Sequence, residues 1–252
     1  MTEQSWLWLG FAGMAAGAAL IFLIGRSRTP REGIATLLHG VVPVIAACSY
    51  FAMAAGQGSI VLPGTTAGTP GYTFYFARYV DWAFTTPILL ASLALSAQHA
   101  GTRRAWPLVG LLLADVLMIV TALFFGLSTV SWIKWTWFAI SCGAFAAVYY
   151  VLWLPLRDDA AAQREDVRTA YASNAAILSV IWFLYPVVLL ADPEGLNVIG
   201  STTSVAAFAV LDLVAKVGFG LLATVRHGRI AEADRREGAA TPDRAPRLAR
   251  AA

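Results

Sequence analysis

The sequence contains few charged residues. Of its 252 residues, 13% are charged and 58% are hydrophobic, and the mean hydropathy is +0.66. Because a soluble domain carries about 25% charged residues, this composition excludes a disordered chain, a coiled coil and a nucleic-acid-binding arm. The net charge of +3 is too small to indicate a polyanionic partner. We therefore expect an integral membrane protein that binds no nucleic acid.

Cysteine is also scarce, and the first apolar segment lacks the features of a secretory signal peptide. Cys48 and Cys142 both lie inside apolar runs, and no CxxC pair is present. This excludes a disulfide framework, so we expect both to be small buried hydrophobic residues, and we expect no metal site. The first apolar segment has no basic flank before it and no A-x-A site, so no secretory signal is predicted.

Long apolar segments make up most of the chain. A spanning helix needs about 20 mainly apolar residues, whereas a β-barrel shows short alternating segments. The sequence therefore predicts an all-α bundle of seven transmembrane helices within residues 1–228, followed by a partly disordered cytoplasmic tail at 229–252. The segments are Trp6–Ile24, Ala35–Ala54, Phe74–Ala97, Trp106–Phe125, Ile133–Leu154, Ala172–Ala191 and Thr203–Thr224.

The basic residues indicate an orientation. Of 18 Lys and Arg residues, 15 lie in the loops between the first and second, third and fourth, and fifth and sixth segments, or in the tail. The opposite side has only Lys134. The positive-inside rule then places the N-terminus outside the cell membrane and the C-terminus in the cytoplasm. The uncharged loop Gly56–Gly71 is predicted to be an ordered extracellular loop or a short hairpin.

Five charged residues lie within the apolar segments: Arg78, Asp81, Asp115, Asp212 and Lys216. Charges at this depth are costly, so each indicates a function by default. Asp212 and Lys216 are four residues apart and share a helix face. Asp81 and Asp212 are expected at a similar depth, where Arg78, Asp81, Asp212 and Lys216 would form a balanced cluster. The alternative is an ion-pair network that only holds two helices together.

The cluster also has a chemical interpretation. An amine in a low-dielectric interior is readily deprotonated and becomes a nucleophile. It can form a Schiff base with an aldehyde, and two adjacent carboxylates would stabilise the protonated imine. The sequence therefore predicts a site for a covalently bound aldehyde cofactor.

Three motifs around these residues resemble a known family. Arg78–Pro87 (RYVDWAFTTP), Trp182–Pro186 (WFLYP) and Leu211–Gly220 (LDLVAKVGFG) are similar to the third, sixth and seventh helices of microbial (type-1) rhodopsins, which include the bacteriorhodopsin-like and proteorhodopsin-like proton pumps. The resemblance covers all seven segments. It implies all-trans retinal on Lys216, Asp81 as primary counterion and proton acceptor, Asp212 as second counterion and Arg78 as a gate toward the exit. It further implies a homo-oligomer, a trimer or a pentamer.

The resemblance also implies a retinal pocket and a proton path. The pocket residues are Trp82, Thr85, Thr86, Leu89, Met118, Ser141, Phe145, Trp182, Tyr185, Ala215 and Lys216. The proton-path residues are His39, Tyr50, Tyr79, Ser92, Glu194 and Ser204. A dry slot walled by flat aromatic side chains suits a conjugated polyene. Phe138 and Leu189 replace tryptophans of bacteriorhodopsin. With Ser204 in place of a carboxylate, early release from a carboxyl pair is not expected.

The third-helix residues Asp81, Thr85 and Ser92 separate the possible activities. Asp81 argues against a chloride pump, and the Asn-Asp-Gln pattern of sodium pumps is absent. We expect an outward light-driven proton pump, a transporter and not an enzyme. The alternatives are a photosensor that signals through a partner, and an inward pump resembling xenorhodopsins, although these typically lack the aspartate at Asp212. A transporter or receptor without a chromophore would leave Lys216 unexplained.

Ser92 stands where outward pumps usually keep a carboxylic proton donor, and a serine hydroxyl cannot supply a proton at neutral pH. His39 is expected at the same depth on a neighbouring helix, and imidazole relays protons near neutral pH. We therefore hypothesise that His39, Ser92 and water form the cytoplasmic gate. The alternative is a histidine that is only hydrogen-bonded near the interface. Asp115 is expected to form an interhelical hydrogen bond.

Overall fold

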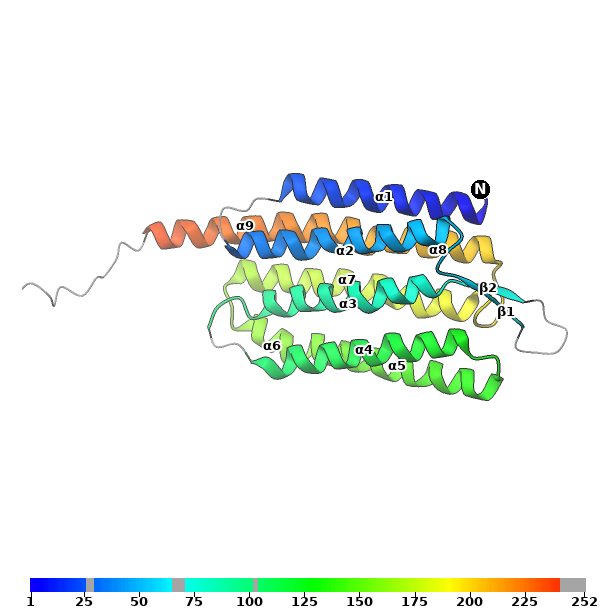
Figure 1. Cartoon of the computed structure of the whole chain (residues 1–252). Coiled ribbons are helices and arrows are strands. Elements are labelled where there is room, and N and C mark those ends of the chain that lie inside the picture. The colour runs from blue at the N-terminus through cyan, green and yellow to red at the C-terminus, as the bar shows by residue number, and fades with distance from the viewer. Residues whose placement is uncertain (26–29, 65–70, 102–103, 241–252) are drawn as a thin grey trace, which may run out of the picture.

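The computed structural model describes residues 1–25, 30–64, 71–101 and 104–240. In chain order the elements are α1 (Glu3–Ile24), α2 (Pro30–Ala54), β1 (Ile60–Leu62), β2 (Tyr72–Phe74), α3 (Phe76–Ala97), α4 (Ala105–Leu127), α5 (Ser131–Trp153), α6 (Pro155–Ala161), α7 (Glu165–Ala191), α8 (Ser201–Asp212), η1 (Leu213–Gly218) and α9 (Phe219–Ala240). The long helices lie side by side in a bundle (Figure 1).

The prediction of seven membrane-spanning helices is confirmed. Within the described residues, seven helical stretches are long and apolar enough to cross a bilayer, with α5 and α6 forming one and α8, η1 and α9 another. Neighbours in the chain pack together from α1 to α5, and α7 and α8 close the bundle against α3 and α1. Prolines 43, 87 and 186 lie inside helices, which is tolerated where neighbouring helices satisfy the freed backbone groups.

Several helices extend beyond the predicted apolar segments. The helix α2 begins at Pro30, α7 begins at Glu165, and α9 continues to Ala240, whereas Phe74 belongs to a strand. Hydropathy marks only the apolar part of a helix, and the additional turns are polar. They form ion pairs with one another, such as Arg235 with Glu32 at 2.7 Å. The tail from residue 241 onward, predicted to be partly disordered, lies outside the described residues.

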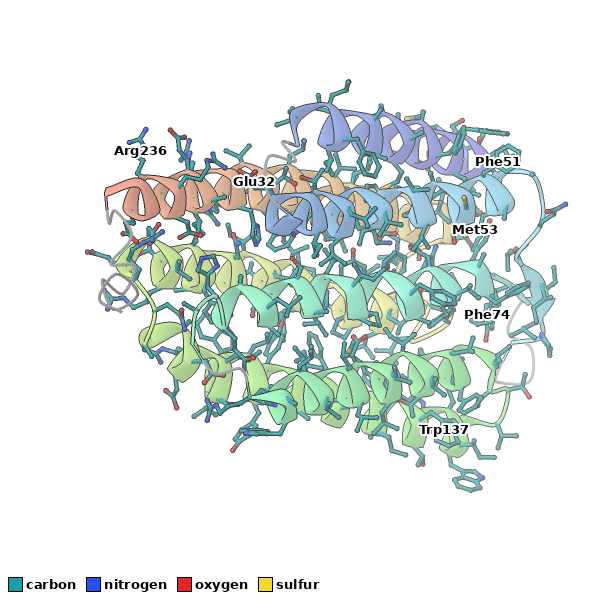
Figure 2. The ribbon with its side chains drawn as sticks, turned by 60° about the vertical axis from the view of Figure 1, so that its left-hand side comes forward. Glu32, Phe51, Met53, Phe74, Trp137 and Arg236 are labelled. Carbon is teal, nitrogen blue, oxygen red and sulfur yellow. The ribbon has the colours of Figure 1, made fainter. Side chains whose placement is uncertain are left out.

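The bundle has two chemically different ends. The end with the N-terminus and the two strands is called the hairpin end here; the end with the arginine-bearing connections and the projecting part of α9 is called the arginine end (Figure 1). Figure 2 shows Phe74 and Met53 toward the hairpin end and Glu32 and Arg236 toward the arginine end. Among the described residues, Arg104, Arg157, Arg164, Arg168, Arg226, Arg229, Arg235 and Arg236 belong to the connections and the last helix at the arginine end, as the sequence predicts.

A hairpin is present, but only its first strand lies within the predicted range Gly56–Gly71, since the second strand begins at Tyr72. The strands β1 and β2 are antiparallel, with Ile60 opposite Phe74 and Leu62 opposite Tyr72, whereas residues 65–70 lie outside the described residues. Gly58 has φ +69°, and a Cβ there would lie 2.5 Å from Cβ of Ala77. Only glycine combines this backbone conformation with so close an approach. With the chain turned at Gly58, the hairpin packs against the end of the bundle. The side chain of Phe74 in β2 is completely buried there.

Buried residues follow one face of each helix, and apolar residues also cover the opposite face. On α1 the buried positions are Leu7, Gly10, Met14, Gly17, Ala18 and Ile21, which repeat every three to four residues. Large apolar side chains on the outer surface, such as Leu23 at 82% exposure, have the character expected for contact with lipid. The prediction that Cys48 is buried is wrong. Its side chain is exposed on α2 and Cys142 is half-buried, and both are free thiols.

Glycine allows α1 to approach the last helix closely. A Cβ at Gly17 would lie 2.4 Å from both methyl groups of Val217, in the π-helical segment η1. Small residues at such contacts let helix backbones pack closely in membranes. Gly143 on α5 is a helical glycine without such a contact, because nothing lies within 4 Å of a Cβ built there. It therefore serves as the control for Gly17.

We predict that Gly17→Ala destabilises the protein and that Gly143→Ala does not. The added methyl at position 17 must displace Val217, and overpacking of this kind costs about 1–3 kcal/mol, which is several degrees in Tm. Thermal unfolding of both variants in detergent checks this. Equal Tm values for the two variants would contradict the close packing of α1 against η1.

Candidate functional site

Lys216 lies in the interior of the bundle within the π-helical segment η1. Its side chain is 2% exposed. Single π-helical turns inside α-helices occur often at functional sites, because the extra residue per turn changes the direction of a side chain. The Lys216 ammonium forms an ion pair with Asp81 of α3, and its Nζ lies 3.1 Å from Oδ1 of Asp212. The structure thus brings together the lysine and both carboxylates of the predicted cluster.

The two carboxylates have different surroundings. Tyr50 donates a hydrogen bond of 2.8 Å to Oδ2 of Asp212, and Tyr185 donates one of 2.8 Å to Oδ1. Asp81 contacts Lys216 through Oδ2, whereas its Oδ1 is buried and has no hydrogen-bond partner among the described residues. Hydrogen bonds to a carboxylate stabilise its charged form. Both oxygens of Asp212 are therefore already engaged, whereas Asp81 keeps a free oxygen that can accept a proton.

Arg78 lies one turn from Asp81 but forms no ion pair with either carboxylate of the cluster. Within the part of the chain that the structure describes, no carboxylate lies within 4.0 Å of its guanidinium. The guanidinium instead lies 4.1 Å from the ring centroid of Phe208, and its Nε has no hydrogen-bond partner. The predicted four-residue cluster is thus a tight group of three, with Arg78 as a separate buried cation on the side of the hairpin end.

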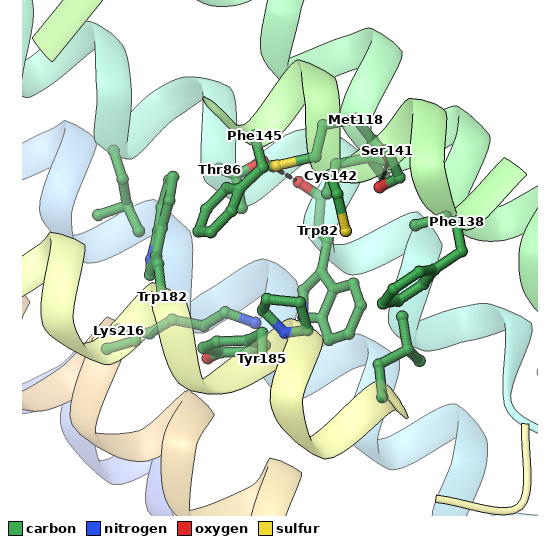
Figure 3. Close-up of a pocket in the computed structure, with 16 residues that line it drawn as sticks. Trp82, Thr86, Met118, Phe138, Ser141, Cys142, Phe145, Trp182, Tyr185 and Lys216 are labelled. Atoms are coloured by element: carbon green, nitrogen blue, oxygen red, sulfur yellow. Dashed lines mark hydrogen bonds between the residues drawn. The ribbon is translucent and has the colours of Figure 1, made fainter. Parts of the chain in front are cut away.

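An apolar pocket opens beside the Lys216 amine. Its lining includes ten of the eleven predicted pocket residues: Trp82, Thr86, Leu89, Met118, Ser141, Phe145, Trp182, Tyr185, Ala215 and Lys216. Figure 3 shows Lys216 toward one end of this group and Phe138 at the other. The space outside atoms is about 730 Å³, including any part open to solvent.

The pocket differs from the prediction at several residues. Thr85 does not line it, because its hydroxyl turns back and donates a 2.8 Å hydrogen bond to the carbonyl of Asp81. The lining residues that the sequence reasoning missed are Ile119, Ala122, Phe138, Cys142, Pro186 and Leu189. Phe138 and Leu189 were noted only as departures from the family. Pro186 ends the Trp182–Pro186 motif but was not predicted to line the pocket, and no charge or motif marks Ile119, Ala122 and Cys142.

The pocket fits an elongated apolar ligand that carries an aldehyde. The amine of Lys216 lies at one end, and the aromatic rings of Trp82 and Tyr185 pack edge-to-face at 5.4 Å between centroids. Asp81 Oδ1 and Trp82 Nε1 are buried polar atoms without partners in the described structure. Such atoms are rare in folded proteins unless a ligand or water completes their hydrogen bonding.

Asp115 forms the interhelical hydrogen bond that was expected. Thr86 of α3 donates to its Oδ2 at 2.9 Å, so Asp115 joins α4 to the helix that carries Asp81. Asp115 has no exposed surface.

A second acidic group lies between Arg78 and the hairpin end. Tyr79 donates a 2.6 Å hydrogen bond to Oε2 of Glu194, and Ser204 donates one of 3.2 Å to Oδ2 of Asp192. Both carboxyl groups are buried. The sequence reasoning singled out Glu194 and Ser204 and missed Asp192, because a lone aspartate in a loop gives no signal of burial. The structure therefore contains a carboxyl pair that the sequence reasoning did not expect.

The pair titrates unusually. Burial and the neighbouring charge of Glu194 raise the pKa of Asp192 well above its usual range, against the opposing effect of Arg78. Burial likewise raises the pKa of Glu194, opposed by Arg78, by the Tyr79 hydroxyl and by Lys134. Lys134, expected only as a lone basic residue outside, is in fact 1% exposed, and its Nζ lies 3.3 Å from the Tyr72 hydroxyl. This carboxyl pair can therefore retain a proton at a pH at which exposed carboxyl groups have lost theirs.

At the other side of the cluster the structure brings His39 and Ser92 together. The Ser92 Oγ lies 3.2 Å from Nε2 of His39, and His39 Nδ1 lies 2.8 Å from the carbonyl oxygen of Ala35. The His39 side chain is buried between α2 and α3. Both groups lie on the side of Lys216 that faces the arginine end.

Comparison with known proteins gives one consistent result. The profile of the family described as "Bacteriorhodopsin-like protein" matches residues 1–229. The chain is 38% identical over 224 residues to "Bacteriorhodopsin" of Haloterrigena sp. (strain arg-4), covering 87% of this chain and 86% of that protein. It is 37% identical to "Archaerhodopsin-2" of Halobacterium sp. (strain aus-2), covering 86% and 82%.

Solved structures agree. The thermophilic rhodopsin from Rubrobacter xylanophilus superposes with a TM-score of 0.84 at 35% identity, covering 91% of this chain and 98% of that one. The light-driven proton pump Coccomyxa subellipsoidea Rhodopsin CsR superposes with a TM-score of 0.82 at 32% identity, covering 88% and 96%.

We predict that Glu194→Gln lowers the pKa of Asp192. The charge of Glu194 raises that pKa, so its removal moves the Asp192 titration to lower pH, while burial still keeps the pKa above the usual range. The protonated-carboxyl stretch of ¹³C-aspartate-labelled protein, followed by infrared spectroscopy across pH, measures the change. Asp158→Asn at the arginine end is the control and should leave this band unchanged. A midpoint that stays or rises in Glu194→Gln would show that the two carboxyl groups do not interact.

Proposed function

Because the chain belongs to the bacteriorhodopsin-like family of microbial rhodopsins, a family of multi-pass membrane proteins with a retinal chromophore, we propose that it is an outward light-driven proton pump. The observation that carries the proposal is the buried amine of Lys216 between Asp81 and Asp212, at the end of an apolar pocket. By this proposal the protein is a transporter and not an enzyme.

We propose that the hairpin end faces outward and the arginine end faces the cytoplasm. The basic residues of the connections at the arginine end support this orientation through the positive-inside rule. The path from Lys216 through Arg78 to the Asp192–Glu194 pair then leads outward. The path from Lys216 through Ser92 and His39 leads to the cytoplasm.

Lys216, Trp82, Trp182 and Tyr185 would hold the chromophore, with the other pocket residues forming its apolar walls. All-trans retinal, held by Lys216 as a protonated Schiff base, would supply the light-driven isomerisation that lowers the affinity of the Lys216 nitrogen for its proton. The protein supplies the acceptor, the exit and the resupply of protons. The dry pocket keeps water from hydrolysing the bond to Lys216.

Asp81 is the acceptor in this scheme, and Asp212 remains an anion. Asp81 Oδ1 is unpartnered, so a proton from the Lys216 nitrogen can bind there without breaking a hydrogen bond. Both oxygens of Asp212 already accept hydrogen bonds from tyrosine hydroxyls, so neither is free in the same way. Once Asp81 is neutral, the positive charge of Arg78 acts more strongly on the Asp192–Glu194 pair, which then releases its stored proton to the outside.

The proton that leaves must be replaced from the cytoplasmic side. Ser92 is not acidic enough to donate at neutral pH, but it is hydrogen-bonded to His39. An imidazole can both accept and donate a proton near pH 7. His39 therefore resupplies the Lys216 nitrogen through Ser92 and water.

We predict that illuminated cells that express the protein and are supplied with retinal acidify their medium, and that a protonophore abolishes the acidification. Lys216→Ala should form no coloured pigment. Asp81→Asn should form pigment but acidify the medium at least about tenfold less, because it lacks the acceptor. Alkalinisation would instead identify an inward pump, and a pigment that causes no pH change would identify a photosensor.

We further predict that His39→Ala slows the final return of the pigment absorbance on the order of 100-fold, because general acid catalysis is lost. Flash photolysis at neutral pH measures this rate. Ser96→Ala is the control, since its hydroxyl bonds only to the carbonyl of Leu93 in its own helix. Unchanged late kinetics in His39→Ala would refute the role of this histidine.

A further inference from the structure

Two of the three histidines of the chain line one cavity at the arginine end, and the third, His39, contacts residues of its lining. The cavity lies between α2, α3 and α9, and its lining includes Ser92, His99 and His227. The ring of His39 packs against that of His227, with centroids 5.4 Å apart. The space outside atoms is about 1360 Å³, including the part open to solvent. The cavity thus reaches from the surface to Ser92, which contacts His39.

The backbone determines which nitrogen of each inner histidine can exchange a proton. His39 Nδ1 lies 2.8 Å from the carbonyl of Ala35, and His227 Nδ1 lies 2.8 Å from the carbonyl of Ala223. A carbonyl only accepts, so Nδ1 carries hydrogen in both rings and protons are gained or lost at Nε2. His39 Nε2 contacts Ser92, whereas no described protein group hydrogen-bonds to His227 Nε2. This atom is available to water in the cavity.

The carboxylates that face the cavity already have partners. Glu32 pairs with Arg235 at 2.7 Å. Asp234 accepts from Arg164 at 3.0 Å and lies 2.9 Å from Nε2 of His99. These pairs hold the mouth of the cavity together and occupy oxygens of both acids. His227 also lines the cavity. In contrast to these acids, its Nε2 is a basic atom with no hydrogen-bond partner among the described protein groups.

We propose that His227 is the proton-uptake residue of this protein. It binds a proton from cytoplasmic water at Nε2, and it passes this proton through water in the cavity to Nε2 of His39, whose ring lies against its own. His39 then donates through Ser92 toward Lys216, and each ring returns to its Nδ1–H neutral form. The inference rests on the proposed function and extends it to a second histidine. A ring that only packs α2 against α9 is the alternative.

The kinetic test uses retinal-loaded protein in lipid vesicles and flash photolysis at neutral pH. His227→Gln should slow the final absorbance return by about tenfold or more while leaving the earlier steps unchanged. His227→Ala should be equally slow, and added imidazole, which fits the vacated space, should restore its rate. His99→Gln is the matched control and should stay within about twofold of the unmodified protein. Unchanged kinetics in His227→Gln, or a slow His227→Ala that imidazole does not restore, would overturn the proposal.

A second readout does not depend on pumping. Solid-state NMR of ¹⁵N-histidine-labelled protein, with signals assigned from His39→Gln and His227→Gln, reports tautomer and titration. We expect His227 in the Nδ1–H form and a shift of the His39 titration midpoint when His227 is replaced. An Nε2–H tautomer, or a His39 titration unaffected by His227→Gln, would overturn the relay. If the medium does not acidify on illumination, the outward pump is refuted, whereas this coupling between the two rings is still measured.

Discussion

The contact of one buried ammonium with two buried carboxylates is the interaction on which the rest of the structure depends. Moving these groups out of water costs several kcal/mol per ion, and only close pairing and further hydrogen bonds offset this cost. Lys216, Asp81 and Asp212 have that pairing, and Tyr50 and Tyr185 complete the hydrogen bonds of Asp212. The π-helical turn directs the lysine inward, and close packing of α1 keeps the site dry.

The two ends of the bundle carry different proton chemistry on either side of this site. Toward the hairpin end, Asp192 and Glu194 are buried together beside Tyr79 and the charge of Arg78. Toward the arginine end, two imidazoles lie in contact beside a cavity open to solvent. A buried carboxyl pair can release a stored proton when a nearby positive charge acts on it more strongly, whereas an imidazole can both accept and donate a proton through its ring nitrogens. This difference between the two ends supports the proposed direction of proton transport, from the arginine end to the hairpin end.

Much of the central site could be predicted, because its residues are exceptions to the apolar pattern. A charge inside a spanning helix must have a partner, and the four-residue spacing of Asp212 and Lys216 places them on one face.

The neighbouring pocket residues could not be predicted, because they do not differ from the apolar pattern around them. Cys142 and Ala122 are apolar on apolar helices, and a bilayer removes the contrast that separates core from surface in soluble proteins. For the same reason Cys48, expected in the core, is on the outer face. Asp192 is a polar residue in a loop, where burial has no signature in the sequence.

The sequence by itself determined the seven helices, the unequal distribution of basic residues and the lysine with its two carboxylates. Those features follow from local rules: the length of an apolar run, the cost of a charge within it and the periodicity of a helix. Only the tertiary structure decided which carboxylate oxygen is unpartnered, that Arg78 lies on Phe208 instead of in the ion cluster, and that residues 192 and 194 form a pair. It also brought His99 and His227 to one cavity, with His39 packed against His227, from parts of the chain far apart in the sequence. These facts depend on contacts between helices and loops, which local periodicity does not specify.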